Sequence, residues 1–168
     1  MPLARTTELE ATNRVLQMMG EAPVNSLTNT FGLAKQANDM LKAVSRTVQS
    51  EGWSFNTDFE ATLARNSSNE ILVNPSVSRV VIDQQLYPDY DITQRGNKLY
   101  DRKNQTFAFT QDLKGDITYM FDWDDLPEHA HQYIMIRAGR QLQDAILGSA
   151  DLTKINITAE QEARAQFL

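Results

Sequence analysis

The N-terminal third of the chain carries apolar side chains at three- and four-residue steps, which is the period of a helix that buries one face. Thr7 stands three residues before Glu10, the capping-box spacing that satisfies two backbone donors at a helix start. Gly20 and Pro23 then favour a stop. The pattern predicts a first helix over residues 7–19, with one largely apolar stripe made by Leu9, Thr12, Val15, Leu16 and Met19.

A second and longer helix is predicted over residues 33–51, because its apolar positions again repeat at helical spacing and polar residues fill the other faces. The stripe consists of Leu33, Ala37, Met40, Leu41, Val44 and Val48. Gly52 breaks this pattern, and two aromatic residues, Trp53 and Phe55, follow it directly. The sequence favours a domain junction whose aromatic side chains pack in the core, over an aromatic binding platform.

The middle of the chain changes to a period of two, which is typical of half-buried strands. Asn74-Pro75 interrupts this stretch, and Gly96 indicates a turn. We predict a small antiparallel, meander-like sheet from these runs. Its expected strands are an alternating run at Phe59, Ala61 and Leu63, β-branched runs at 71–73 and 77–82, a hairpin of 98–102 with 106–110, and an alternating run from Ile117 to Trp123.

Helical spacing returns near Asp125, which can cap a helix whose first turn holds Pro127. This third helix is predicted to end at Gly148, and its small residues Ala138 and Gly139 permit close approach of another helix or subunit. A last helix is predicted to start at Thr158. The helical pattern is still running at Leu168, as expected for a docked or truncated C-terminus.

These elements predict an α+β fold, with a bundle of about four helices and an inserted small antiparallel β subdomain. The expected domains are the N-terminal helices at 1–58, the β subdomain at 59–124 and the C-terminal helices at 125–168. The chain has 168 residues, which suits one domain with such an insertion.

Composition narrows the possible chemistry. The chain has no cysteine, so disulfides, thiolate metal sites and thiol nucleophiles are excluded. Its formal net charge is −6 without a basic stripe, so a direct grip on DNA phosphates is not expected. The sequence shows no bilayer-spanning apolar run and no signal-peptide core at its start, which predicts a soluble protein made in the cytoplasm.

Catalytic motifs are sparse: the sequence contains no GxSxG, P-loop, GxGxxG or HExxH pattern. His129 and His131 are two residues apart on a predicted helix, so they point to nearly opposite faces and are poorly placed to share a metal. We therefore predict no metal, no cofactor and no catalytic residue. Acidic residues cluster at Asp89, Asp91, Asp122, Asp124 and Asp125, and they leave open a carboxylate pair for glycoside hydrolysis or ordinary solvated loops.

Three arginines lie on predicted helices at positions where they could contact another part of the protein or another subunit: Arg46, Arg137 and Arg140. Either they form ion pairs on the surface of one subunit or they pair one subunit with the next. The sequence leaves both interpretations open.

Five short motifs occur in an order that resembles a known family. They are GEAPVNSL at 20–27, VQSEGWSFN at 48–56, RGNKLYDR at 95–102, DLPE at 125–128 and RAGRQ at 137–141. In this order they resemble tail tubular protein A, the head-to-tail adaptor of T7-like short-tailed bacteriophages. The resemblance covers most of the chain.

The resemblance implies a structural virion protein of the phage tail that is not an enzyme and is assembled in the host cytoplasm. It implies a dodecameric ring of identical subunits between the portal protein and a nozzle of the tail tubular protein B type. Genomic DNA would pass through the ring during ejection without specific binding, and no membrane would be involved.

Within such an adaptor, the resemblance implies roles for particular residues. Arg46, Arg137 and Arg140 would lie at lateral contacts of the ring, and the C-terminal helix would reach the portal. Candidates for nozzle contact come from the loops around 95–103, namely Arg95, Lys98 and Arg102. Trp53 and Phe55 would lock the bundle to the sheet. The alternative functions are a polysaccharide hydrolase associated with a phage tail, which uses a carboxylate pair, and a binding module that forms no ring.

Overall fold

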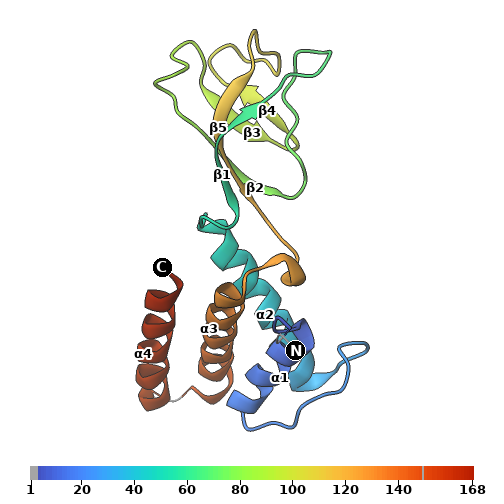
Figure 1. Cartoon of the computed structure of the whole chain (residues 1–168), viewed down its shortest axis with the longest axis vertical. Helices are drawn as coiled ribbons and strands as arrows, with labels where there is room; N and C mark the ends of the chain where they lie inside the picture. The colour runs from blue at the N-terminus through green and yellow to red at the C-terminus, as the bar shows by residue number, and fades with distance from the viewer. Residues whose placement is uncertain (1–3, 149) are drawn as a thin grey trace. The chain divides into compact units, whose positions relative to one another are not determined.

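A computed structural model describes residues 4–148 and 150–168 of the chain (Figure 1). The chain forms two compact units. The helical unit combines residues up to Val48 with residues from Phe121 onward, and the β unit is the continuous segment Gln49–Met120. The sequence had placed these divisions at 58/59 and 124/125. The α+β class is confirmed by helices and small antiparallel sheets.

The helical unit is built from helices whose apolar faces were visible in the sequence. Thr7 caps the first helix, and both hydrogen bonds of its capping box with Glu10 are present. The second helix buries Val48 and the rest of its predicted stripe except Leu33 and Met40, which are half-buried. The helices are α1 (Glu8–Met18), α2 (Gly32–Ser50), α3 (Glu128–Leu147) and α4 (Ala150–Phe167), with the short 3-10 helix η1 (Trp123–Asp125) before α3.

Helix α3 packs against α1 on one side and α4 on the other. The predicted close approach at Gly139 is confirmed, because a Cβ placed there would lie 2.4 Å from Sδ of Met18 on α1. Helix α2 is joined to α1 by the amide of Asn38, which donates to Glu8 at 2.8 Å and to Thr12 at 3.1 Å. Helix α1 therefore contacts both α2 and α3, and α3 in turn carries α4.

Two predicted helix starts are wrong. Helix α3 takes Pro127 as its N-cap, because Asp125 belongs to η1 and its N–H donates to the carbonyl of Asp122. Helix α4 already begins at Ala150, so Thr158 lies inside it. The predicted stop at Gly148 is confirmed, and its left-handed backbone (φ 57°) ends α3 shortly before α4 begins.

The β unit contains five strands in two antiparallel sheets. They are β1 (Thr57–Leu63), β2 (Val77–Ile82), β3 (Ile92–Arg95), β4 (Lys98–Asp101) and β5 (Leu113–Tyr119). The larger sheet has the order β1-β5-β2, so the predicted meander is wrong: the last strand lies between the first two. This strand buries Leu113, Ile117 and Thr118, and so it takes the position that is covered on both edges. It ends at Tyr119, short of the predicted Trp123.

The predicted hairpin is also wrong in its pairing. β4 pairs with β3 across the turn at Gly96, whose φ of 61° confirms that turn. The segment after β4 contacts that strand through an isolated bridge between Asp101 and Thr106. The carboxylate of Asp101 explains this loop, because it accepts hydrogen bonds from the N–H groups of Asp91 at 2.9 Å and Lys103 at 3.0 Å. The buried carboxylate of Asp101 thus satisfies backbone N–H groups of this loop, in place of the strand pairing that the predicted hairpin would have supplied.

A bulge in β1 changes which side chains face the core. The register shifts between Asp58 and Ala61, and Glu60 has a left-handed backbone with φ 51°. Phe59 is consequently 68% exposed, whereas Ala61 and Leu63 face inward as predicted. The β-unit core draws on both sheets and on the segment between β1 and β2, and its buried members are Leu63, Ile71, Val73, Leu99, Phe109, Leu113 and Ile117.

Asn56 holds together the segment that begins the β unit through hydrogen bonds of its side-chain amide. The sequence pattern did not mark this residue. Its amide nitrogen donates to the carbonyls of Gln49 and Tyr119, each at 2.8 Å, and its oxygen accepts from the N–H of Trp53 at 2.8 Å. Trp53 and Phe55 are half-buried beside it. Asn56 therefore ties residues 49–56 to the end of β5, which places them with the sheet.

Two glycine substitutions should differ in their effect on stability. A Cβ at Gly115 would lie 2.6 Å from the backbone oxygen of Val81, which cannot move without disturbing β2. We expect Gly115→Ala to lower the free energy of unfolding by about 1–3 kcal/mol, the range for overpacking. Gly139→Ala is the matched control, because its neighbour Met18 has a flexible end that can move. Urea denaturation of both variants is the measurement, and an equal loss in both would contradict the assignment.

Candidate functional site

The predicted arginines of α3 lie against α4. The side chains of Arg137 and Arg140 are 17% and 19% exposed, and that of Glu160 on α4 is 18% exposed. Arg140 forms an ion pair with Glu160 through Nε and with Asp144 through Nη1, the latter at 2.8 Å. Nε of Arg137 lies 3.6 Å from Oε1 of Glu160. Two cations of one helix therefore share a carboxylate of the next.

An aromatic contact continues this interface between α3 and α4. Tyr133 is buried, and its ring stacks on Phe167 with centroids 5.0 Å apart. The hydroxyl of Tyr133 accepts hydrogen bonds from Arg137 and Arg164, each at 3.3 Å. The ion-pair interpretation of Arg137 and Arg140 thus has direct partners within one chain. Their subunit-to-subunit role stays a prediction, as does that of Arg46, which is exposed on α2.

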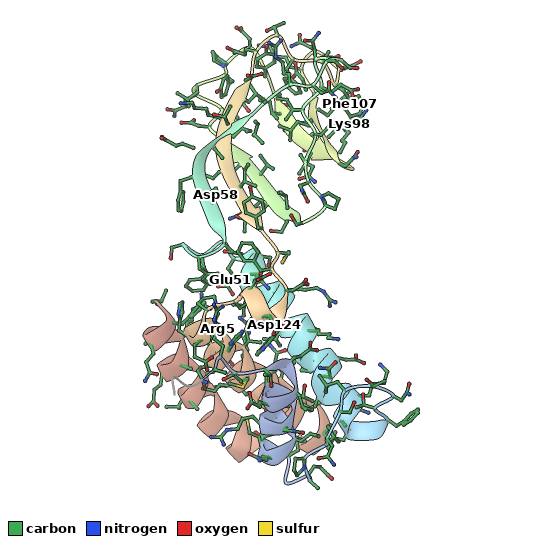
Figure 2. The ribbon with its side chains drawn as sticks, turned by 45° about the vertical axis from the view of Figure 1, so that its right-hand side comes forward. Arg5, Glu51, Asp58, Lys98, Phe107 and Asp124 are labelled. Carbon is green, nitrogen blue, oxygen red and sulfur yellow. The ribbon has the colours of Figure 1, made fainter. Side chains whose placement is uncertain are left out.

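The start of α3 holds the N-terminal segment through Glu128. Its two carboxylate oxygens accept from Thr6, from the N–H at 2.9 Å and from the hydroxyl at 2.6 Å. Nε1 of Trp123 donates to the carbonyl of Thr6 at 2.8 Å, and Arg5 donates to the carbonyl of Asp124 at 3.2 Å (Figure 2). Arg5 and Thr6, which precede α1, are thereby fixed to η1 and α3.

The protonation of Glu128 reflects these contacts. Partial burial opposes its ionisation, but the hydrogen bonds from Thr6, Gln132 and His131 outweigh that effect and lower the pKa of Glu128 to about 2. A carboxylate with such a pKa is charged throughout the ordinary pH range, so it serves as a fixed acceptor. It is a poor general acid near neutral pH for the same reason.

The two histidines have separate environments. His131 is fully buried, its ring stacks on Trp123 at 4.3 Å between centroids, and its Nε2 lies 2.7 Å from the carbonyl of Trp123. His129 is exposed and lies against the ring of Phe167. Within residues 4–148 and 150–168, the described histidine and carboxylate side chains form no group of three or more that could hold a metal ion.

The acidic residues near η1 are exposed helix-end groups. Asp122 is the N-cap of η1, and Asp124 and Asp125 occupy its first turn. In the β unit, the carboxylate of Asp91 pairs with Arg102 at 2.7 Å, and Asp89 is exposed. These positions fit solvated loops and caps, which was one of the two interpretations of the acidic clusters.

The cations predicted for nozzle contact lie on the β3–β4 hairpin and the loop that follows. The guanidinium of Arg95 lies 3.7 Å from the centroid of the Tyr100 ring, and Lys98 pairs with Glu70 at 2.8 Å. Arg102 is exposed and is held by Asp91. Arg95 and Lys98 are register partners and so share one face of the hairpin, whereas Arg102 follows β4 in the loop.

Sequence reasoning missed two residues that organise these surfaces. Asp101 is fully buried; burial favours its neutral form, but the hydrogen bonds from Asp91, Asn104 and Lys103 prevail and lower the pKa of its carboxyl. Glu160 lies in the predicted last helix, but no pattern in the sequence marks it. Its two arginine partners come within reach only because α3 packs on α4.

The comparisons with known proteins give one family. A family model described as tail tubular protein, or Tube, matches residues 9–168. No curated protein gave a significant match to the chain. Because the family match takes in nearly the whole length, the chain belongs to the tail tubular protein family and is a structural component of the phage tail. The family predicted from the five motifs is confirmed. No helix in the part of the chain that the structure describes is long and apolar enough to cross a bilayer.

The pKa of Glu128 predicts a specific acid sensitivity. Its ordinary pKa is 4.5 and its folded value is about 2, so its contribution to stability is fully present above pH 4.5 and is lost as the pH falls towards 2. The stability difference between wild type and Glu128→Gln should therefore be constant above about pH 5 and shrink below it. Urea denaturation between pH 2.5 and pH 7 measures this. Glu162→Gln, at an exposed position on α4, is the control. A difference that does not vary with pH would contradict the proposed acceptor role.

The shared carboxylate of Glu160 predicts a rescue by charge exchange. Arg140→Glu should lower the free energy of unfolding by about 1–3 kcal/mol, since Glu160 and Asp144 then face a like charge. Adding Glu160→Arg to Arg140→Glu should recover part of that loss, because it restores one opposite-charge pair while Asp144 and Arg137 each keep a like-charged neighbour. Hydrogen exchange of α4, together with urea denaturation, reports the effect. If the single and double variants are equally destabilised, the pair does not hold α4.

Proposed function

We propose that this chain is the head-to-tail adaptor of a short-tailed phage, which forms a ring between the portal and the tail nozzle around the DNA exit channel. The observation that carries the proposal is the family match over residues 9–168 to tail tubular proteins. The ring is a dodecamer, assembled in the host cytoplasm. Its role is structural and needs no catalytic group, cofactor or metal.

The construction of the chain supports a ring of identical subunits. A closed ring requires a heterologous contact, in which one face of a subunit meets a different face of the next. The helical unit offers Arg46 on an exposed position of α2, and α3 carries half-buried Arg137 and Arg140 next to α4. In the proposal α2 and α3 supply lateral contacts, while α4 reaches the portal.

The charge of the chain supports a conduit. A formal net charge of −6 repels phosphate, so DNA can slide through a lumen of this protein without being held. In the same proposal the β3–β4 hairpin, with Arg95 and Lys98, and the loop at Arg102 meet the nozzle. Partners are therefore other copies of the chain, the portal protein and the nozzle protein. Genomic DNA passes through without specific contacts, and a membrane has no part in this function.

Native mass by light scattering tests the proposal, with the protein alone and with purified portal. We expect a ring-sized complex in the presence of portal, whether or not the protein forms a ring by itself. A protein that remains monomeric with portal would overturn the adaptor function.

The variants separate folding from assembly. The double variant Arg140→Glu/Glu160→Arg restores the ion pair within one chain. If this variant assembles normally, Arg140 serves only that ion pair and has no part in the contact between subunits. Arg46→Glu changes an exposed residue of α2 and should weaken assembly without lowering the unfolding midpoint. Unchanged assembly by Arg46→Glu would remove that residue from the lateral contact.

A further inference from the structure

The outer face of the three-stranded sheet carries an open hollow of about 860 Å³. Three exposed apolar side chains line it: Phe59 at 68%, Val81 at 47% and Leu86 at 63% exposure. Its polar lining consists of Glu60, Asp83, Asp116 and Lys114. We call this surface the acidic groove. Its apolar floor and its excess of carboxylates over cations are the two properties that a partner must match.

The β1 bulge is the reason that Phe59 lies in the acidic groove. An uninterrupted strand would place Phe59 on the same side as Ala61 and Leu63, in the core. The left-handed backbone of Glu60, at φ 51°, breaks this alternation and leaves Phe59 outside. A non-glycine residue in that conformation costs of order 1 kcal/mol. A strained backbone at Glu60 and an exposed aromatic ring at Phe59 thus lie next to each other. This combination is typical of a contact surface.

A second exposed surface lies on the β3–β4 hairpin, and we call it the cationic patch. It consists of Leu72, Arg95, Lys98, Tyr100 and Phe107. Arg95 lies over Tyr100, and Nζ of Lys98 is 5.8 Å from the centroid of Phe107. Figure 2 labels Lys98 and Phe107 in the β unit. The rings of Tyr100 and Phe107 meet edge to face at 4.8 Å. Leu72 is 52% exposed and forms a bridge with Lys98, so it lies on the same face.

The acidic groove and the cationic patch are on opposite faces of the β unit. In β4, Leu99 points into the core, so its neighbours Lys98 and Tyr100 point outward. In β5, Leu113 and Ile117 point into the same core, which directs Asp116 to the other outer face. The register pairs Asp116 with Val81 on that face. The core therefore separates the two surfaces.

We propose that the acidic groove of one β unit receives the cationic patch of a second copy of this chain, in a head-to-tail contact. Apolar groups are present on both surfaces, and the excess charge is negative on one and carried by Arg95 and Lys98 on the other. Lys98 is partly neutralised by Glu70, so Arg95 carries most of the complementarity. Because the two surfaces differ and lie on opposite faces, each copy can join two neighbours, which is the arrangement of a heterologous contact.

This inference rests on the proposed ring and assigns the β units to a lateral contact within it. In that arrangement Arg95 and Lys98 face a neighbouring copy, so of the three cations only Arg102, in the loop after β4, remains for the nozzle. The ring proposal itself used only the helical unit for lateral contacts. The two can therefore be tested separately, because a ring held together by helices alone would leave the acidic groove and the cationic patch apart.

Cross-linking of the assembled protein is the test. The chain has no cysteine, so introduced cysteines are the sole targets of a short bismaleimide. Leu72→Cys and Val81→Cys replace exposed residues of the two surfaces. In the portal-bound assembly, the protein with both cysteines should give a ladder of cross-linked multimers, and each single variant should remain monomeric on a denaturing gel. A protein with Val81→Cys and Thr62→Cys, the latter exposed on the same outer face of the sheet as Val81, is the control and should give no ladder.

Charge exchange adds a second readout in the double-cysteine protein. Arg95→Glu should lower the yield of cross-linked multimers severalfold, and adding Glu60→Lys should restore it. Lys103→Glu, the same charge change at an exposed position outside the cationic patch, should leave the yield unchanged.

The outcomes distinguish the two proposals. A ring that assembles on the portal but gives no ladder overturns the β-unit contact and leaves the adaptor function intact. Single variants that cross-link as well as the double variant overturn the head-to-tail arrangement. If the wild-type protein fails to assemble on the portal, the adaptor function is wrong and this contact falls with it.

Discussion

The position of α4 in the helical unit depends on the ion pairs that Arg137 and Arg140 of α3 form with Glu160 of α4. Arg137 and Arg140 are largely removed from water, and a charge in that position is stable only with a partner. Glu160 supplies that partner from α4, and Tyr133 accepts a hydrogen bond beside it. Helix α4 is therefore held by polar contacts of defined geometry as well as by the stacking of Phe167. These polar contacts fix the orientation of α4 on α3, which a purely apolar contact between the two helices would not ensure.

The β unit solves a different problem, because its sheets are short and its loops are long. Two buried polar side chains satisfy backbone groups that strand pairing leaves open. Asn56 bonds the entry segment to Gln49 and Tyr119, and Asp101 gathers the N–H groups of the loop around β4. Each replaces several ladder hydrogen bonds with a single side chain. The outer faces are then free to carry surface chemistry that the core does not need.

The helices could be predicted from the sequence largely because their signals are local. The capping box at Thr7, the stripe of α2 and the stop at Gly148 depend on residues within one or two turns. Strand order depends on contacts between distant residues, and the sequence carries no local sign that β5 belongs between β1 and β2. The bulge at Glu60 was equally hidden, because alternation alone cannot reveal a left-handed residue that is not glycine. For the candidate site, the arginines of α3 could be found as cations on a helix face. Their partner Glu160 became visible only when α4 was placed beside them.

The insertion of the β unit between α2 and α3 sets the order in which contacts become available during synthesis. All residues of Gln49–Met120 lie in one continuous stretch, so every contact inside the β unit can form once Met120 has left the ribosome. The helical unit is divided, and α1 and α2 emerge long before the α3 that packs on α1. Met18 of α1, which lies against Gly139 of α3, thus has to wait for the C-terminal third of the chain. Translation therefore completes the inserted unit first and the unit that carries both chain ends last.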